Sequence, residues 1–382
     1  MISGLRIHNF RAIADSDLLE PSPGLTALVG PNGAGKSSLV EALRMLHESM
    51  VTDPTKALSR WRGWASVRHR AAAASEPVEI FLSMLEQATK LPAAYLLQLQ
   101  QAKNGIDVLV ETEALFRKLG KGPGKKRDLL IAKRGKGMVR DEGSKAWVPF
   151  ELSDRELAIR YHADRARHKH IIPFAEDIAS WRFVNPVPAL MRPPTPLSVD
   201  SAWQETGISV ALQLARATKE QIATISRRLT HLVEGTAAID ARLASEGALI
   251  ELKEQVHQGL FPSWTLSDGT LRILAILTAL YVGSPPGLLC VEEPENSLHP
   301  SVIDSLLTEF RNASERGTQV LITTHSPHLL NRLNLAVDTA YFVDRPSGAA
   351  RFTRLPADER TRKEMERYGL GELLEQGSLK PA

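Results

Sequence analysis

Residues 30–37 read Gly-Pro-Asn-Gly-Ala-Gly-Lys-Ser, which is the spacing of a phosphate-binding loop. An apolar run at 25–29 precedes this stretch, and a segment typical of a helix, 38–48, follows it. The loop can wrap a polyphosphate in backbone N–H groups, which only a glycine-rich turn can aim inward without Cβ clashes. The start of the following helix adds partial positive charge. The sequence therefore predicts a nucleotide site in an α/β protein, in preference to a glycine-rich turn that binds nothing.

The last residues of this loop carry side chains suited to phosphate chemistry. Lys36 is expected to reach the β- and γ-phosphates, and the Ser37 hydroxyl is expected to ligate Mg²⁺. Ser38 can donate a further hydrogen bond. The nucleotide-binding residues predicted here are Asn32, Gly33, Ala34, Gly35, Lys36, Ser37 and Ser38.

The composition is that of an ordinary globular protein. The chain has 382 residues, of which 43% are hydrophobic, and a net charge of +3, which neither demands nor excludes a nucleic-acid partner. The single cysteine, Cys290, rules out an internal disulfide and favours a reducing compartment. We find no signal-like N-terminus and no apolar stretch of membrane-spanning length, so a cytoplasmic, non-membrane protein is expected.

The pattern of apolar residues divides the chain into segments. Residues 5–10 and 25–29 are predicted as strands, and several short apolar runs between 78 and 152 indicate antiparallel strands. Helical spacing dominates 155–256, which also holds a proline-rich connector at 185–196, and the last third alternates strand and helix as a parallel sheet requires. The predicted division is a head that contains the phosphate-binding loop (1–75 and 258–382), an antiparallel β subdomain (76–154), and a connector with a helical lobe (155–257).

Two carboxylates end the apolar strand predicted at 288–291. We assign Glu292 to the metal and Glu293 to polarising an attacking water, which is what a Mg²⁺-dependent hydrolase needs beside its phosphate loop. The alternative is an acidic turn that closes a buried strand. His325 follows another apolar strand and could meet the γ-phosphate, although a lone histidine at a strand end is more often structural. The predicted catalytic residues are therefore Lys36, Glu293 and His325.

A second candidate anion site is the sequence Leu-Ser-Asp-Gly-Thr at 266–270, which precedes a predicted helix. The Ser267 hydroxyl and the backbone around Gly269 could bind an anion there. Taken alone, this stretch could equally be a helix cap.

These motifs, in this order, resemble the ABC-type ATPase heads of the SMC, RecF and OLD group, especially the stand-alone AAA-family ATPases of bacterial defence loci. Asn9-Phe10-Arg11 resembles the strand motif whose arginine approaches the nucleotide in such heads. The resemblance implies a P-loop ABC-ATPase head with a mixed central sheet, an antiparallel β subdomain and an inserted helical lobe, with ATP and Mg²⁺ as ligands. The stretch after His325 is too short for the fused nuclease domain of OLD relatives, so a form without it is expected.

The same resemblance implies how the site would work. ATP would lie between two heads, with Ser267 and Gly269 acting on the nucleotide of the partner in a homodimer. The expected function is an ATP-hydrolysing switch that regulates a separately encoded effector, or acts on DNA, in bacterial defence or repair. The alternative is a low-turnover, ATP-bound scaffold that restrains a toxin or nuclease. The residue corresponding to a Q-loop glutamine is not assigned.

A basic stretch between 118 and 140 is a candidate DNA contact. The alternative is a solvated loop, which the lack of aromatic stacking residues within the stretch favours. The basic residues are Lys118, Lys121, Lys125, Lys126, Arg127, Lys133, Arg134, Lys136 and Arg140.

Overall fold

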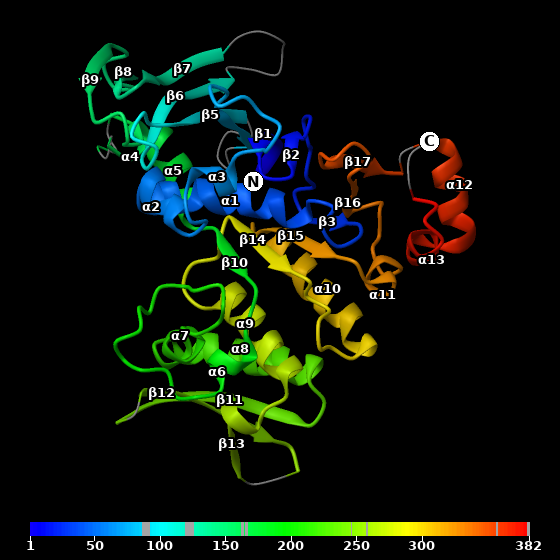
Figure 1. Ribbon diagram of the computed structural model, residues 1–382. Helices are drawn as coiled ribbons and strands as arrows, with labels where there is room; N and C mark the ends of the chain where they lie inside the picture. The colour runs from blue at the N-terminus through cyan, green and yellow to red at the C-terminus, as the bar shows by residue number, and fades with distance from the viewer. Residues whose placement is uncertain are drawn as a thin grey trace.

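The structure, a computed structural model, describes residues 1–85, 92–118, 126–161, 164, 167–245, 247–256, 259–356 and 358–379. Three β-sheets and the helices packed on them make up these residues (Figure 1). The expected α/β class, with a mixed central sheet, is confirmed.

The six-stranded central sheet has the order β10-β14-β15-β3-β16-β17. All its neighbouring strands are parallel except β16 and β17, which form an antiparallel hairpin. The strands are β3 (Leu25–Val29), β10 (Arg182–Val184), β14 (Leu288–Glu292), β15 (Gln319–Thr324), β16 (Thr339–Asp344) and β17 (Arg351–Leu355).

Both faces of this sheet are covered by helices, as a parallel sheet requires. Leu28 of β3 belongs to the core that contains α1 (Lys36–Val51), whereas Leu25 and Val29 belong to the core that contains α9 (Asp268–Tyr281) and α10 (Pro300–Glu315). Figure 1 shows α1 and α10 on opposite sides of the sheet. Cys290 of β14 is fully buried, and this burial raises the pKa of its thiol.

The eight-stranded antiparallel sheet has the order β2-β1-β4-β5-β6-β7-β8-β9. Its first strand is the predicted strand at 5–10, which pairs with β2 and β4 and not with β3. The sheet therefore joins the N-terminus to the predicted β subdomain across residue 75. The strands are β1 (Ile2–Phe10), β2 (Ile13–Asp15), β4 (Val78–Leu85), β5 (Pro92–Gln101), β6 (Val108–Lys118), β7 (Lys126–Lys133), β8 (Lys136–Arg140) and β9 (Trp147–Glu151).

Short helices connect these sheets. They are α2 (Pro54–Ser59), α3 (Trp64–Val67), α4 (Ala158–Tyr161), α5 (Ile171–Ala179) and α6 (Pro188–Met191), and, near the C-terminus, α11 (Pro327–Leu330), α12 (Glu359–Tyr368) and α13 (Leu370–Glu375). Within the described ranges, no helix combines the length and apolarity needed to cross a bilayer.

The predicted helical lobe is wrong over residues 236–254. Helices α7 (Val210–Ala215) and α8 (Lys219–Leu232) do form, and Thr218 and Gln221 close a capping box on α8. They are followed by an antiparallel sheet made of β11 (Thr236–Ala244), β12 (Gly247–Glu254) and β13 (Leu260–Pro262). The lobe is therefore mixed α/β.

Tertiary packing overrides helix propensity in this segment. Gly247 has φ +133°, and a Cβ at this position would lie 2.2 Å from the Thr195 carbonyl oxygen. Both the backbone conformation and the close packing therefore require glycine at this turn. β12 is buried against α7, and β11 packs against α7 and α8. Arg242 pairs with Glu251 across the two strands at 3.0 Å. Gly235 and Gly247 flank β11 and mark turns at both of its ends. The helix-like spacing of apolar residues led the prediction to overlook these turns.

A buried carboxylate stabilises one corner of the antiparallel sheet. Glu113 of β6 is 0% exposed and accepts hydrogen bonds from the Tyr95 hydroxyl at 2.9 Å and from the backbone N–H groups of Ala158 and Ile159. Burial raises its pKa to about 7, although these three donors act in the opposite direction. The protonated form of Glu113 is thus favoured on folding.

We therefore expect the native state to lose stability as the pH rises from about 4.5 through about 7, because Glu113 binds a proton more tightly when folded than when unfolded. The loss attributable to this group is about 3 kcal/mol. Thermal unfolding between pH 5 and 8 should show a steeper fall for the wild type than for Glu113→Gln, while Glu151→Gln, at an exposed carboxylate, should follow the wild type. Parallel curves for all three proteins would contradict the assignment.

Candidate nucleotide-binding site

The phosphate-binding loop lies between β3 and α1 and presses against the β16–β17 hairpin. A Cβ at Gly30 would lie 2.1 Å from the Val343 carbonyl oxygen, and one at Gly35 would lie 2.5 Å from the Ala350 Cβ. Both glycines, and Gly33, have positive φ. The glycines of the loop are therefore required by backbone conformation and, at two positions, by close packing.

Two side chains at the start of α1 already have partners. The Lys36 amine donates to the carbonyl oxygens of Gly30 at 2.6 Å and Pro31 at 3.0 Å, and burial lowers the pKa of this amine. The Ser37 hydroxyl donates to Glu292 Oε2 at 2.9 Å. The structure thus brings together the two residues that the sequence assigns to the metal, and their hard oxygen atoms fit Mg²⁺.

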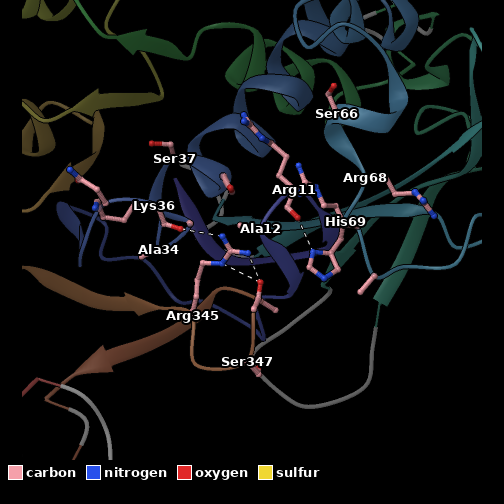
Figure 2. A pocket seen from close by; sticks show the side chains of 18 of the residues that line it. Arg11, Ala12, Ala34, Lys36, Ser37, Ser66, Arg68, His69, Arg345 and Ser347 are labelled. Atoms are coloured by element: carbon pink, nitrogen blue, oxygen red, sulfur yellow. Dashed lines mark hydrogen bonds between the residues drawn. The ribbon is translucent and has the colours of Figure 1, made fainter.

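A cavity of about 790 Å³ opens over the phosphate loop, a size suited to a small-molecule ligand. Residues 32–38, Arg11 and Glu293 line it, as predicted. The lining residues that sequence reasoning missed come from two other segments: Arg68, His69 and Arg70 after α3, and Arg345, Ser347 and Gly348 in the β16–β17 hairpin (Figure 2).

Arg345 and His69 are fixed by backbone acceptors of the motifs beside them. Arg345 Nη1 donates to the Gly33 carbonyl oxygen at 3.4 Å, and His69 Nδ1 lies 2.8 Å from the Arg11 carbonyl oxygen. Arg11 has φ +51° and projects into the cavity. Among the described residues that line the cavity, several are arginines and one, Glu293, is a carboxylate. This excess of positive charge favours an anionic ligand.

The second carboxylate of the acidic strand end is held by its own loop. Glu293 has φ +46°, and its N–H donates to the Thr323 carbonyl oxygen at 3.0 Å. Asn296 Nδ2 donates to Glu293 Oε2 at 2.8 Å, and His325 Nδ1 lies 3.1 Å from Oε1. His325 thus contacts the predicted water-polarising carboxylate, whereas its predicted contact with a γ-phosphate stays a prediction.

The second anion-binding motif lies apart from this cavity. Ser267 caps α9, accepting a hydrogen bond from the Thr270 N–H at 3.1 Å, and Asp268 pairs with Arg192 at 2.5 Å. A Cβ at Gly269 would lie 2.6 Å from the Ser297 carbonyl oxygen, so this helix start packs on the loop after Glu293. Ser267 and Gly269 are not among the residues that line the cavity.

The basic stretch also differs from its sequence-based interpretation. Lys121 and Lys125 lie outside the described residues. The aromatic side chains missing from the stretch come from neighbouring strands, with Lys126 over the Phe116 ring at 4.8 Å and Arg140 over the Trp147 ring at 5.8 Å. Basic and aromatic side chains therefore lie together on these strands, and DNA contact stays a prediction.

The fold and the site together define a P-loop nucleotide-binding head of the SMC/RecF-like ABC ATPase class. Residues 133–331 match the family described as "AAA domain, putative AbiEii toxin, Type IV TA system", and residues 4–56 match a further "AAA domain" family. The first match covers more than half of the chain, which therefore belongs to this family.

Two comparisons with individual proteins agree with this class. A segment of 43 residues is 51% identical to the chromosome partition protein Smc of Rhodopseudomonas palustris and 42% identical to that of Lactiplantibacillus plantarum. It spans 11% of this chain and only 4% of each Smc protein.

Solved structures of Smc heads share the fold along most of the chain. One is an Smc head bound to the C-winged helix domain of ScpA, with a TM-score of 0.55, 13% identity, and coverage of 95% of this chain and 99% of that one. Another is an Smc head with an extended coiled coil bound to the C-terminal domain of ScpA derived from Pyrococcus furiosus, with a TM-score of 0.55, 12% identity, and coverage of 96% and 98%. At these identities the likeness concerns the fold alone.

Gly35→Ala should destabilise the protein more than Gly33→Ala. Both substitutions strain a left-handed backbone by about 1 kcal/mol, but at Gly35 overpacking against Ala350 adds about 2 kcal/mol more. A Cβ at Gly33 meets nothing within 4 Å. Thermal unfolding of the two variants measures the difference, and equal melting temperatures would show that the loop does not pack tightly on the hairpin.

Arg345→Ala should weaken ATP binding about tenfold, because one charge-assisted contact is worth about 1.5 kcal/mol. Arg354→Ala is the matched control, since Arg354 lies on β17 of the same hairpin and pairs with Glu20 at 3.8 Å, away from the cavity. Isothermal titration with ATP measures both affinities. An unchanged affinity in Arg345→Ala would remove this residue from the nucleotide site.

Proposed function

We propose that this chain is a Mg²⁺-dependent ATP-binding and hydrolysing switch, in which two copies close on ATP. The observation that carries the proposal is that Ser37 is hydrogen-bonded to Glu292 and lines, together with Glu293, the cavity over the phosphate loop. These residues lie far apart in the sequence, on α1 and at the end of β14. Their convergence beside the anion-favouring cavity supports phosphate chemistry over a structural turn.

Each residue has a defined task in this proposal. The Lys36 amine exchanges its two loop carbonyl acceptors for phosphate oxygens, and the loop N–H groups bind the same phosphates. Glu293, oriented by Asn296 and His325, accepts a hydrogen bond from the attacking water and aligns it. Ser37 and Glu292 would hold Mg²⁺, which neutralises phosphate charge when bound.

The position of Ser267 and Gly269 supports a two-headed site. Neither residue lines the cavity of its own chain, so their helix start is available to the nucleotide of another copy. ATP would then control association, and the protein would act as a switch as much as an enzyme. In this proposal the homodimer regulates a separately encoded effector, or acts on DNA through the basic stretch, in defence or repair. The toxin–antitoxin wording of the family description is compatible with that role.

Glu293→Gln should retain ATP binding, stall hydrolysis and accumulate an ATP-bound dimer, because the neutral amide lacks the charge and basicity with which the carboxylate polarises the attacking water. Lys36→Ala should lose nucleotide binding. Light scattering with and without Mg-ATP measures the mass, and a phosphate-release assay measures turnover. Doubling of mass only in the Glu293→Gln protein with ATP is the expected result.

Two controls sharpen this experiment. Ser267→Arg should bind ATP as a monomer yet fail to dimerise, and dimerisation that survives this change would refute the trans role of the motif. Equal loss of ATP binding in Lys36→Ala and Glu293→Gln would overturn the assigned roles. A mass that ATP leaves unchanged, together with negligible turnover, would favour the scaffold alternative.

A further inference from the structure

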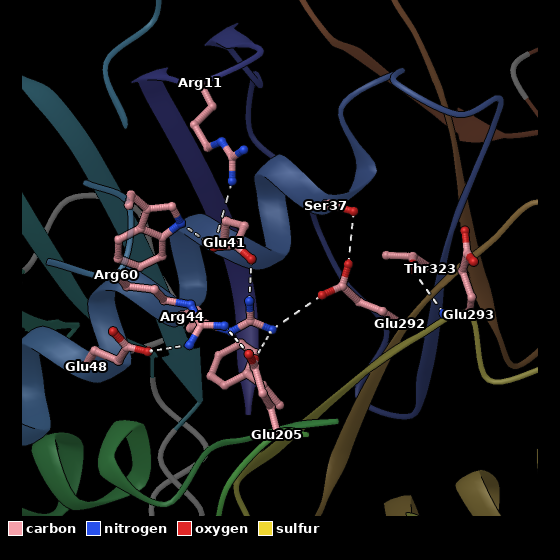
Figure 3. A network of polar contacts seen from close by, with 12 residues as sticks. Arg11, Ser37, Glu41, Arg44, Glu48, Arg60, Glu205, Glu292, Glu293 and Thr323 are labelled. Carbon is pink, nitrogen blue, oxygen red and sulfur yellow. Dashed lines mark hydrogen bonds and ion pairs between the residues drawn. The ribbon is translucent and has the colours of Figure 1, made fainter. Parts of the chain in front are cut away.

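A buried arginine lies directly behind the predicted metal ligands. Arg44, about two turns along α1 from Ser37, is 3% exposed. Its Nη2 atom lies 3.3 Å from Glu292 Oε1, while the other oxygen of this carboxylate accepts the Ser37 hydroxyl hydrogen bond (Figure 3). The Glu292 carboxylate is therefore held from both sides, and its orientation depends on Arg44.

The same nitrogen atom has a second carboxylate partner. Arg44 Nη2 lies 2.7 Å from Glu205 Oε2, and the guanidinium stacks over the Phe183 ring at 5.0 Å from the centroid. Arg44 Nη1 also pairs with Glu41. Glu205 and Glu292 thus share one cationic nitrogen atom as an ion-pair partner, and in a buried site a closer approach of this atom to one carboxylate weakens the ion pair with the other.

Glu205 is part of the segment that leads to the α/β lobe. Its carbonyl oxygen accepts the Asn185 N–H at 3.0 Å, and the Trp203 indole donates to the Phe183 carbonyl oxygen at 2.8 Å. The chain then enters α7, which packs with α9 in the second core. Arg44 is therefore a physical link between the metal carboxylate and the α/β lobe, whose helix α7 packs on α9, the helix that Ser267 caps.

The charges around Arg44 do not balance. Glu48 is 3.5 Å from Arg60, which also pairs with Glu205, and Arg11 lies 3.8 Å from Glu41. The connected groups are three arginines (Arg11, Arg44 and Arg60) and four carboxylates (Glu41, Glu48, Glu205 and Glu292). One carboxylate exceeds the cations, and Glu292, at the end nearest the phosphate loop, is the one placed to take an added cation.

We propose that Arg44 is a positioning residue that couples occupation of the Ser37–Glu292 metal site to Glu205 and hence to the α/β lobe. The proposal rests on the function proposed above and adds its regulation. When Glu292 binds a cation, its ion pair with Arg44 weakens, and Arg44 pairs more closely with Glu205 and Glu41. The segment around Glu205 is then held more tightly against α1. Conversely, a lobe position that draws Glu205 away from Arg44 strengthens the hold of Arg44 on Glu292 and raises the Mg²⁺ requirement.

The test is a Mg²⁺ titration of the binding of a fluorescent ATP analogue to the full chain, with binding in EDTA as the reference. Glu205→Gln should raise the half-saturating Mg²⁺ concentration about fivefold, because Arg44 then holds Glu292 more tightly. Arg44→Met should lower it, because Glu292 is released. Opposite shifts in the two variants are expected only if Glu205 and Glu292 compete for Arg44, since general destabilisation moves both variants in the same direction.

Glu48→Gln is the matched control, because Glu48 contacts Arg60 and belongs to the same network without pairing with Arg44. It should leave the Mg²⁺ dependence unchanged. If Arg44→Met does not fold, as loss of a buried cation among carboxylates can cause, Glu205→Gln and Arg44→Lys decide the question. Arg44→Lys keeps the charge but loses the rigid guanidinium whose Nη2 atom pairs with both Glu205 and Glu292, so Glu205→Gln should have a smaller effect in that background.

The two proposals fail in different ways. A wild type that binds no nucleotide, or binds it without any Mg²⁺ dependence, overturns the proposed function and this inference with it. The coupling alone is overturned if nucleotide binding by the wild type depends on Mg²⁺ and the wild type, Glu205→Gln and Glu48→Gln all have the same half-saturating Mg²⁺ concentration. Shifts of the same sign in Glu205→Gln and Arg44→Met also overturn the coupling.

Discussion

Burial of β3 on both faces is the constraint from which the candidate site follows. Its alternate residues enter two different cores, so the strand cannot slip by one residue without exposing one of them. β3 has β15 on one side and β16 on the other, and β14 lies beyond β15. Since these strands are parallel, their carboxyl ends share one edge of the sheet.

That shared edge explains why distant parts of the sequence meet. The phosphate loop follows β3, Glu293 follows β14, His325 follows β15, and Arg345 follows β16. Each of these residues comes directly after, or one residue after, a buried strand. The site is thus a product of topology, and its electrostatics follow as well, because basic side chains from several segments face a glycine-rich loop that is itself an anion cradle.

Local patterns allow part of this arrangement to be predicted from the sequence. The glycine spacing at 30–37 and the paired carboxylates at 292–293 each lie next to an apolar strand. In the structure the two motifs are in contact, through the hydrogen bond from Ser37 to Glu292. Arg345 and His69 could not be found in this way, because each acts through a contact with a segment remote in sequence, at Gly33 and Arg11. Residues 236–254 were misjudged because alanine-rich, helix-compatible sequence is held in strands by burial against α7 and α8.

The buried thiol of Cys290 in β14 can serve as a chemical probe of opening of the central sheet. Because Cys290 is sealed between helices, an alkylating reagent can reach it only through openings of the sheet, so its labelling rate reports the free energy of those openings. Protection by a ligand would register directly as slower labelling. With no second cysteine in the sequence, a spin label or fluorophore can be attached at an engineered surface position without first removing a competing native thiol.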